Sequence, residues 1–257
     1  MSNKSRTPHS FKAPPMTRIV GKYSTDCNII GGIPDYSVLL DYITEKSKAS
    51  GDGGFVFRTQ NALSRFSKSI DTGILQFASP KHKELFMSAI AGEQYTNAEK
   101  MLILFWQMIY ANKLFGKITE NIFMPAVYSG RISLDKNEVL SYLRFLQKEE
   151  PQSLPWSENT LDTTASKYLS TLKKLGLADG SLVKTILHPV ISDSLFVYFV
   201  NWALAVDKDK TLNNPFFFYS FYDTTGLISR LKKIELIPYW NISQIGNDIM
   251  IELKAHE

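Results

Sequence analysis

The polar residues of the segment WSENTLDTTASKYLSTLKKLGL, residues 156–177, are of the types that contact nucleic acids. These residues recur at helical spacing and carry one amide, four hydroxyls and three ammonium groups: Asn159, Thr160, Thr163, Ser166, Lys167, Ser170, Lys173 and Lys174. Amides and hydroxyls bind base edges, whereas hydroxyls and ammonium groups bind phosphate oxygens. No carboxylate follows Asp162 within this segment, although a solvated helix usually mixes both signs. The pattern therefore predicts a face that binds DNA.

An amphipathic helix has to position these side chains. Its apolar residues recur at spacings of three and four, which predicts a buried face made of Leu161, Ala165, Tyr168, Leu169, Leu172 and Leu175. Ser157 is suited to cap the first turn, and Gly176 is suited to end the helix. Two other interpretations stay open: a plain surface helix packed through its leucines, and a helix that docks another protein.

The neighbouring segments give this helix a context. A helix over residues 135–148 precedes it, with Asp135 and Glu138 placed as a capping box. The prolines of EEPQSLPW then enforce a turn, and Asp179-Gly180 makes a second turn before a strand-like segment over residues 181–190. Helix, turn, helix and strand is the order of a winged helix-turn-helix, whose second helix enters the major groove.

A related order returns near the C-terminus. Residues 223–234 predict a short helix that carries Arg230, Lys232 and Lys233, and the alternating segments 236–243 and 249–254 predict a hairpin. The chain therefore contains two candidate DNA-binding units, residues 131–192 and 211–257.

The expected fold is mainly α with small β hairpins, in two lobes with winged helix-turn-helix-like units. Residues 1–22 predict a flexible basic tail, because they contain Pro8, Pro14 and Pro15, five cations and no acid. Residues 23–130 predict an N-terminal helical domain with helices near 34–48, 60–68, 80–91 and 97–115. Residues 131–257 predict a C-terminal domain that holds both units.

Composition narrows the class of protein. A hydrophobic fraction of 44% supports a folded core, and a net charge of +4 with a pI near 8.9 is compatible with a nucleic-acid partner. The single cysteine, Cys27, excludes an internal disulfide and a cysteine-based zinc site, and it fits a reducing compartment. The apolar runs 101–115 and 195–206 are shorter than the roughly 18–20 residues of a membrane span, so they predict buried helices and no membrane partner.

The sequence predicts no enzyme, no metal and no cofactor. None of the four histidines stands at a metal-ligand spacing from an acid or a cysteine: His9, His82, His188 and His256. The sequence also contains no phosphate-binding loop and no nucleophile elbow. A basic cluster of Arg58, Arg65, Lys68, Lys81, His82 and Lys83 is either a surface patch or ordinary solvated charge. The aromatic run at residues 215–222 predicts core packing rather than a platform for stacking bases.

Three segments resemble the BrxA family, accessory proteins of BREX bacteriophage-defence systems. They are YSTDCNIIGGIPDYSVLL at residues 23–40, the segment at 156–177 described above, and RLKKIELIPYW at residues 230–240. The resemblance implies a mostly helical bacterial cytoplasmic protein that binds double-stranded DNA and has no enzymatic activity of its own. It also implies partner proteins of the same system, a DNA methyltransferase and an ATPase among them. A protein–protein adaptor and a transcriptional regulator of its operon are the alternative functions.

Overall fold

The computed structural model describes residues 23, 36–47, 60–245 and 248–254, and these residues are mainly helical with two small antiparallel sheets. The helices are α1 (Ser37–Ser47), α2 (Gln60–Gly73), α3 (Pro80–Ala91), α4 (Asn97–Ala111), α5 (Lys113–Ile118), α6 (Met124–Tyr128), α7 (Lys136–Glu149), α8 (Glu158–Lys174), α9 (Asp193–Val206) and α10 (Thr224–Leu231). Shorter helical segments are the π-helical η3 (Thr119–Phe123) and the 3-10 helices η4 (Pro215–Tyr219) and η5 (Ile234–Leu236). The strands are β1 (Ser133–Leu134), β2 (Ala178–Asp179), β3 (Lys184–Ile186), β4 (Trp240–Ile245) and β5 (Asp248–Leu253).

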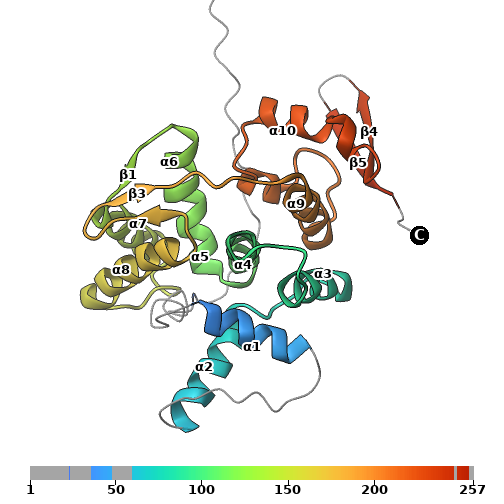
Figure 1. The fold of residues 1–257 in the computed structure, drawn as a ribbon. Coiled ribbons are helices and arrows are strands. Elements are labelled where there is room, and N and C mark those ends of the chain that lie inside the picture. The colour runs from blue at the N-terminus through green and yellow to red at the C-terminus, as the bar shows by residue number, and fades with distance from the viewer. Residues whose placement is uncertain (1–22, 24–35, 48–59, 246–247, 255–257) are drawn as a thin grey trace, which may run out of the picture.

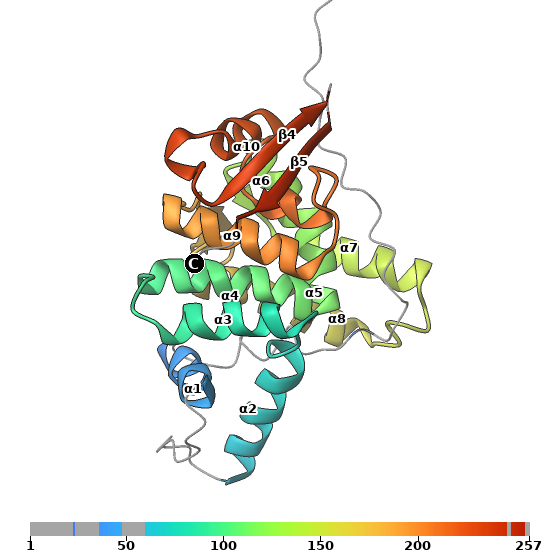
Figure 2. The ribbon, with the colours of Figure 1, turned by 90° about the vertical axis from the view of Figure 1, so that its right-hand side faces the viewer.

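Helix α4 forms the centre of the molecule. Every side chain from Leu102 to Ile109 is buried, so other elements cover α4 on all sides. Figure 1 shows α5–α8 with β1 and β3 on one side of α4, and α9, α10 and the β4–β5 hairpin on the other. Figure 2 shows α9, α4 and α3 as successive rows, and α3 and α9 also contact each other.

The helix expected over residues 97–115 is interrupted at Asn112. The Asn112 side chain accepts a hydrogen bond from the backbone N–H of Phe115 at 2.9 Å and so caps α5 as α4 ends. A Cβ atom at Gly116 would lie 2.7 Å from the carbonyl oxygen of Ile109, so glycine lets α5 turn closely against α4. The prediction of one continuous helix over residues 97–115 was therefore wrong after Ala111, where α4 ends.

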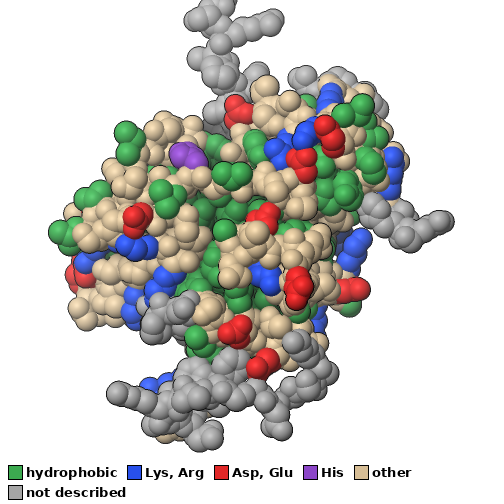
Figure 3. Space-filling view, viewed as in Figure 1, with side chains coloured by type: hydrophobic (Ala, Val, Ile, Leu, Met, Phe, Trp, Pro, Cys, Tyr) green, Lys and Arg blue, Asp and Glu red, His purple; other side chains and the backbone are tan. Residues whose placement is uncertain are grey.

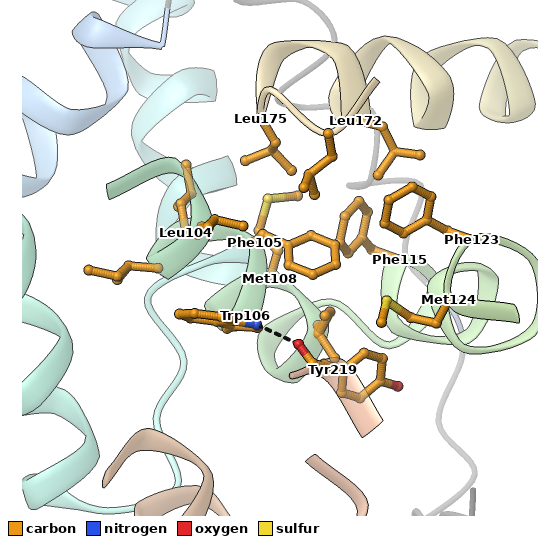
Figure 4. Close-up of a cluster of buried hydrophobic side chains, with 14 of the residues drawn as sticks. Leu104, Phe105, Trp106, Met108, Phe115, Phe123, Met124, Leu172, Leu175 and Tyr219 are labelled. Carbon is orange, nitrogen blue, oxygen red and sulfur yellow. Dashed lines mark hydrogen bonds between the residues drawn. The ribbon is translucent and has the colours of Figure 1, made fainter. Parts of the chain in front are cut away.

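Aromatic side chains hold the two sides of the molecule together around α4. The indole N–H of Trp106 donates to the carbonyl oxygen of Tyr219 at 3.0 Å, as Figure 4 shows. The hydroxyl of Tyr128 donates to the carbonyl oxygen of Phe218 at 2.6 Å. Phe216, Phe217, Phe218 and Tyr219 are all buried. This confirms that the aromatic run at 215–222 belongs mainly to the core.

The first sheet joins segments on either side of α7 and α8. Its strand order is β1-β3-β2, with Ser133 opposite Thr185 and Ala178 opposite Ile186. The strand-like segment expected over residues 181–190 is confirmed only for the three residues of β3. The hairpin expected near the C-terminus is confirmed as β4 and β5, although its first strand begins at Trp240 and not at residue 236. The Trp240 indole N–H donates to the carbonyl oxygen of Leu231 at 2.9 Å.

The expected boundary at residue 130 falls in a turn, where Gly130 has a φ of +68°. Packing crosses this boundary, because α9 contacts both α3 and α4. These contacts do not separate two domains at residue 130, so the division into domains of residues 23–130 and 131–257 stays a prediction. The predicted tail at residues 1–22 lies outside the described residues.

Candidate nucleic-acid interface

Both ends of α8 are fixed by the residues that the sequence indicated. The Ser157 hydroxyl accepts from the backbone N–H of Thr160 at 3.3 Å and caps the first turn. Gly176, with a φ of +72°, donates to the Lys173 carbonyl at 3.0 Å, and Leu177 donates to the Leu172 carbonyl at 2.9 Å. This pair of bonds is a Schellman motif, which satisfies carbonyls that the helix end leaves open.

The apolar face of α8 is buried as expected. Its members are all 3% exposed or less: Leu161, Ala165, Tyr168, Leu169, Leu172 and Leu175. The Tyr168 hydroxyl lies 3.0 Å from the Thr119 hydroxyl, a buried hydrogen bond that ties α8 to η3. Helix α7 packs along α8 and begins with the predicted capping box of Asp135 and Glu138. The opposite face of α8 is thereby oriented away from the core.

The structure brings the predicted α8 residues together on that outer face. Asn159 and Lys173 are exposed. The other six are half-buried: Thr160, Thr163, Ser166, Lys167, Ser170 and Lys174. This surface offers one amide, four hydroxyls and three ammonium groups along one helix. Their role in binding DNA stays a prediction.

Two of the hydroxyl groups already donate within the helix. Ser166 Oγ donates to the Asp162 carbonyl at 3.1 Å, and Ser170 Oγ donates to the Ser166 carbonyl at 2.9 Å. Phosphate oxygens accept hydrogen bonds and need donors. Each serine would therefore have to exchange its intrahelical bond for one to phosphate.

The cations at the C-terminal end of α8 have partners from other elements. Lys173 Nζ lies 2.9 Å from the Asp179 carboxylate in β2, and this ion pair lowers the pKa of Asp179 below its usual range. Lys174 Nζ lies 5.9 Å from the centre of the Tyr36 ring, and desolvation lowers the pKa of Lys174. Neither contact was expected, because Tyr36 and Asp179 belong to other segments of the chain.

Helix α7 neutralises the acids at the start of α8. Lys136 Nζ lies 2.7 Å from the Asp162 carboxylate, and Arg144 is paired with Glu158. Sequence reasoning assigned neither cation a role, although both lie on the helix that precedes α8. In Figure 3, Lys and Arg side chains appear over the part of the molecule where Figure 1 places α7 and α8. Because these two acids are paired with cations, the N-terminal end of α8 carries less net negative charge.

The loop between β2 and β3 accepts hydrogen bonds from the Lys184 side chain and presents apolar side chains. Lys184 Nζ donates to the carbonyls of Gly180 at 2.7 Å and Ser181 at 2.5 Å. Leu182 at the loop is 88% exposed. We define the apolar sheet surface by the exposed side chains of this loop and its flanks: Ile132, Leu182, Val183, Leu187 and Val190. Figure 3 shows exposed hydrophobic side chains on the side of the molecule where Figure 1 labels β1 and β3.

The second set of predicted DNA-binding residues is engaged in contacts within the fold, with α9 for Arg230 and Lys233 and with β4 for Lys232. Arg230 lies 2.6 Å from the Asp193 carboxylate and donates to the Ile191 carbonyl at 2.9 Å. Lys233 Nζ lies 2.5 Å from the same carboxylate, and Lys232 Nζ donates to a side-chain oxygen of Gln244 at 2.5 Å. Figures 1 and 2 both place α10 on the other side of α4 from α8. The two predicted sets do not form one continuous surface, and a DNA contact by the second set stays a prediction.

His82 does not belong to the basic surface cluster in which the sequence placed it. It is fully buried; its Nδ1 accepts from the backbone N–H of Ala78 at 3.1 Å, and its Nε2 lies 2.8 Å from Gln107 Oε1. Burial lowers the pKa of His82 to about 4. Arg58, another member of that cluster, lies outside the described residues.

A groove of about 580 Å³ lies where the end of α8 meets the start of α4, lined by Met101, Lys174, Leu175 and Val190 among others. Among residues 36–47, 60–245 and 248–254, no three His, Cys, Asp or Glu side chains are grouped so that they could hold a metal ion. Within the same part of the chain, every helix is too short or too polar to cross a membrane.

Comparison with known proteins gives one match. A model of the BrxA family matches residues 67–201, just over half of the chain. The matched range runs from within α2 to within α9 and includes α7, α8 and the first sheet. No curated protein and no solved structure matches the chain.

Proposed function

The chain belongs to the BrxA family of BREX-associated proteins, and from this premise we propose that it is a non-enzymatic accessory protein that binds double-stranded DNA in bacterial phage defence. The observation that carries the proposal is the arrangement of α5–α6, β1, α7, α8, β2 and β3. The order of helix, strand, two helices and two strands, with the sheet order β1-β3-β2, agrees with that of a winged helix-turn-helix and supports the proposal. In a fold of that kind α8 would be the recognition helix.

The chemistry of α8 suits this position. The major groove of B-DNA is about 12 Å wide and accepts one helix. Asn159 and Thr163 lie in the first turns, where a recognition helix meets base edges. Lys167 and Lys173 lie further along, where they would neutralise phosphates. The pairing of Glu158 and Asp162 with cations of α7 reduces the repulsion that these acids would exert on DNA.

A binding titration tests the role of α8. The triple variant K167A/K173A/K174A is compared with the wild type on a labelled duplex over a range of KCl concentrations, by fluorescence anisotropy. Each lost phosphate contact lowers the salt slope by about 0.9, so the variant is expected to lose up to about 2.7 and to bind more weakly. A matched control, K81A/K208A/K210A, removes the same charge from exposed positions outside α7 and α8.

The outcomes separate the alternatives. Unchanged binding in the α8 variant would remove this helix from the proposed interface. Equal losses in both variants would reduce its role to general electrostatic attraction. No binding by the wild type at low salt would contradict DNA binding itself.

A protein–protein adaptor is the second candidate function, and the apolar sheet surface favours it. Gathered exposed apolar side chains are typical of protein interfaces. A co-purification with the methyltransferase and the ATPase of the same system tests this function, and L182D is the variant. Loss of an observed interaction in L182D, with α8-dependent DNA binding retained, would assign the two surfaces separate roles. We place both functions in the bacterial cytoplasm, where those partners and DNA meet.

A further inference from the structure

The two outer edges of the β4–β5 hairpin differ in what covers them. On β5, the backbone N–H of Ile251 donates to the carbonyl oxygen of Lys210 at 2.8 Å. Thr211 forms an antiparallel β-bridge with Met250. β5 also carries Glu252, an exposed acid, and charged side chains discourage an edge strand from pairing with another chain. The outer edge of β5 is therefore covered and protected.

The outer edge of β4 presents backbone groups that have no partner in the described part of the chain. The register places Ile242 opposite Ile251. In an antiparallel pair, backbone groups alternate between facing the partner strand and facing away from it. Ile251 directs its N–H away from β4, to Lys210, so Ile242 directs its own N–H and C=O away from β5. Trp240, two residues earlier, does the same, and no hydrogen bond reaches these four groups from the residues that the structure describes.

β4 also lacks the features that usually protect an edge strand. Its six residues, Trp240–Ile245, include no charged residue and no proline. A hollow of about 360 Å³ lies beside the strand, lined by Leu231, Lys232, Ile237 and Ile242 among others. Figure 2 shows the hairpin at the surface, in front of α10. An open strand edge beside a hollow is a site where an extended segment adds a strand.

The surroundings of this edge fit a second copy of the same chain. Each copy presents the same patch in a twofold interface, so the patch needs both a projection and a hollow. Two exposed apolar side chains project beside the hollow: Ile234 is 75% exposed and Ile237 is 50% exposed. Because β4 is uncharged, two antiparallel copies of it place no like charges opposite each other. Pairing of this kind covers both β4 edges at once, and the covered β5 edges stop the assembly at two copies.

We propose that the chain forms a twofold homodimer in which the β4 strands of two copies pair antiparallel, so that the two hairpins become one four-stranded sheet. The backbone groups of Trp240 and Ile242 pair across the interface, and Ile234 and Ile237 pack against the hollow of the other copy. This is a small contact beside the standard interface of about 800 Å² per partner, so we expect a dissociation constant in the micromolar range. The inference does not depend on DNA binding, and its test uses the protein alone.

The experiment is sedimentation velocity of the full chain at concentrations from about 1 to 100 μM, across the expected dissociation constant. The wild type should rise from its monomer mass of 29.2 kDa towards twice that value. N241K/S243K adds two charges at exposed positions of β4 and should stay near the monomer mass. The matched control, S88K/Q94K, adds the same charge at exposed positions in and after α3 and should dimerise like the wild type.

A second pair of variants tests the backbone edge itself. I242P removes the outward N–H, which has no partner within the described fold, so the hairpin should form while the dimer is lost. I242A shortens the same side chain but keeps the N–H, so it should still dimerise, with an affinity at most severalfold weaker. Circular dichroism melting checks that both variants remain folded.

The outcomes decide between strand pairing and the alternatives. A wild type that stays monomeric at the highest concentration would overturn the proposal, and the open edge would then await a strand from a different protein. A dimer that persists in both N241K/S243K and I242P would also overturn it, and its loss in L182D would assign it to the apolar sheet surface. Equal losses in S88K/Q94K, or in I242A and I242P alike, would show that net charge or the Ile242 side chain, and not the strand edge, controls association.

Discussion

The ammonium group of Lys173, in the last turn of α8, lies 2.9 Å from the carboxylate of Asp179 in β2. Lys173 Nζ also donates to the Gly180 carbonyl at 3.2 Å, the same oxygen that accepts from Lys184. The end of the proposed recognition helix and the following β2–β3 loop therefore share one small polar cluster. If α8 binds DNA as proposed, a phosphate has to compete with Asp179 for Lys173.

Replacing Asp179 by asparagine should strengthen DNA binding. D179N removes the competing carboxylate and releases Lys173 from its ion pair, so affinity should rise severalfold and the salt slope by up to about 1. Fluorescence anisotropy on duplex DNA measures both quantities. E84Q makes the same charge change at an exposed position of α3 and serves as the control. An equal gain in E84Q would mean that net charge, and not the release of Lys173, accounts for the effect.

Helix α8 could be predicted because its signals are local. The apolar spacing, the Ser157 cap and Gly176 at the C-terminal end lie within about twenty consecutive residues, and each acts through neighbours on the same helix. The capping box of α7 was readable for the same reason. Local patterns therefore sufficed for the two helices at the proposed site.

The parts that the sequence did not predict depend on pairing between distant segments. Strands β1 and β2 have two residues each, too few for an alternating pattern, and they exist only through their hydrogen bonds to β3. The charge pattern of α8 looked one-sided because Asp179 lies on another element. Likewise, Arg230 looked available for DNA because its partner Asp193 lies 37 residues away in the chain.

Two glycines after α8 should respond differently to alanine. Gly176 has a φ of +72° with open space around it, so G176A should cost about 1 kcal/mol in the free energy of unfolding, from backbone conformation alone. Gly180 has a φ of +100°, and a Cβ there would lie 2.5 Å from the Val183 carbonyl oxygen, so G180A should cost more, about 2–3 kcal/mol. Urea denaturation of the two variants measures the difference. A smaller loss in G180A than in G176A would contradict the tight turn between β2 and β3.

Buried His82 should make the protein less stable in mild acid. Its folded pKa is lowered to about 4 from 6.5, so between these values the unfolded chain binds a proton that the folded chain does not. The free energy of unfolding should therefore fall as the pH drops from about 6.5 to 4, by at most about 1.4 kcal/mol per pH unit, and this contribution is constant above pH 6.5.

The variant H82Q isolates this contribution from that of the carboxylates. Glutamine does not titrate and retains an oxygen that can accept from the backbone N–H of Ala78. The variant should be less stable than the wild type at pH 7, and the difference should shrink as the pH falls towards 4. Urea denaturation at pH 7, 6, 5 and 4.5 gives the comparison. A constant difference between the two proteins would show that His82 keeps an ordinary pKa in the folded state.

Two buried threonines of α8 should respond in opposite directions to valine, which has nearly the same shape. The Thr164 hydroxyl is buried and has no hydrogen-bond partner within the described part of the chain, whereas the Thr171 hydroxyl donates to the Lys167 carbonyl at 2.9 Å. A buried polar group without a partner carries a desolvation cost, so T164V should stabilise the fold by about 1 kcal/mol. T171V removes a bonded hydroxyl and should destabilise it by a similar amount. At this chain length each change shifts Tm by about 2–4 °C, which calorimetry resolves. A fall in Tm for T164V would mean that the Thr164 hydroxyl is hydrogen-bonded in solution. Both threonine hydroxyls would then stabilise the fold.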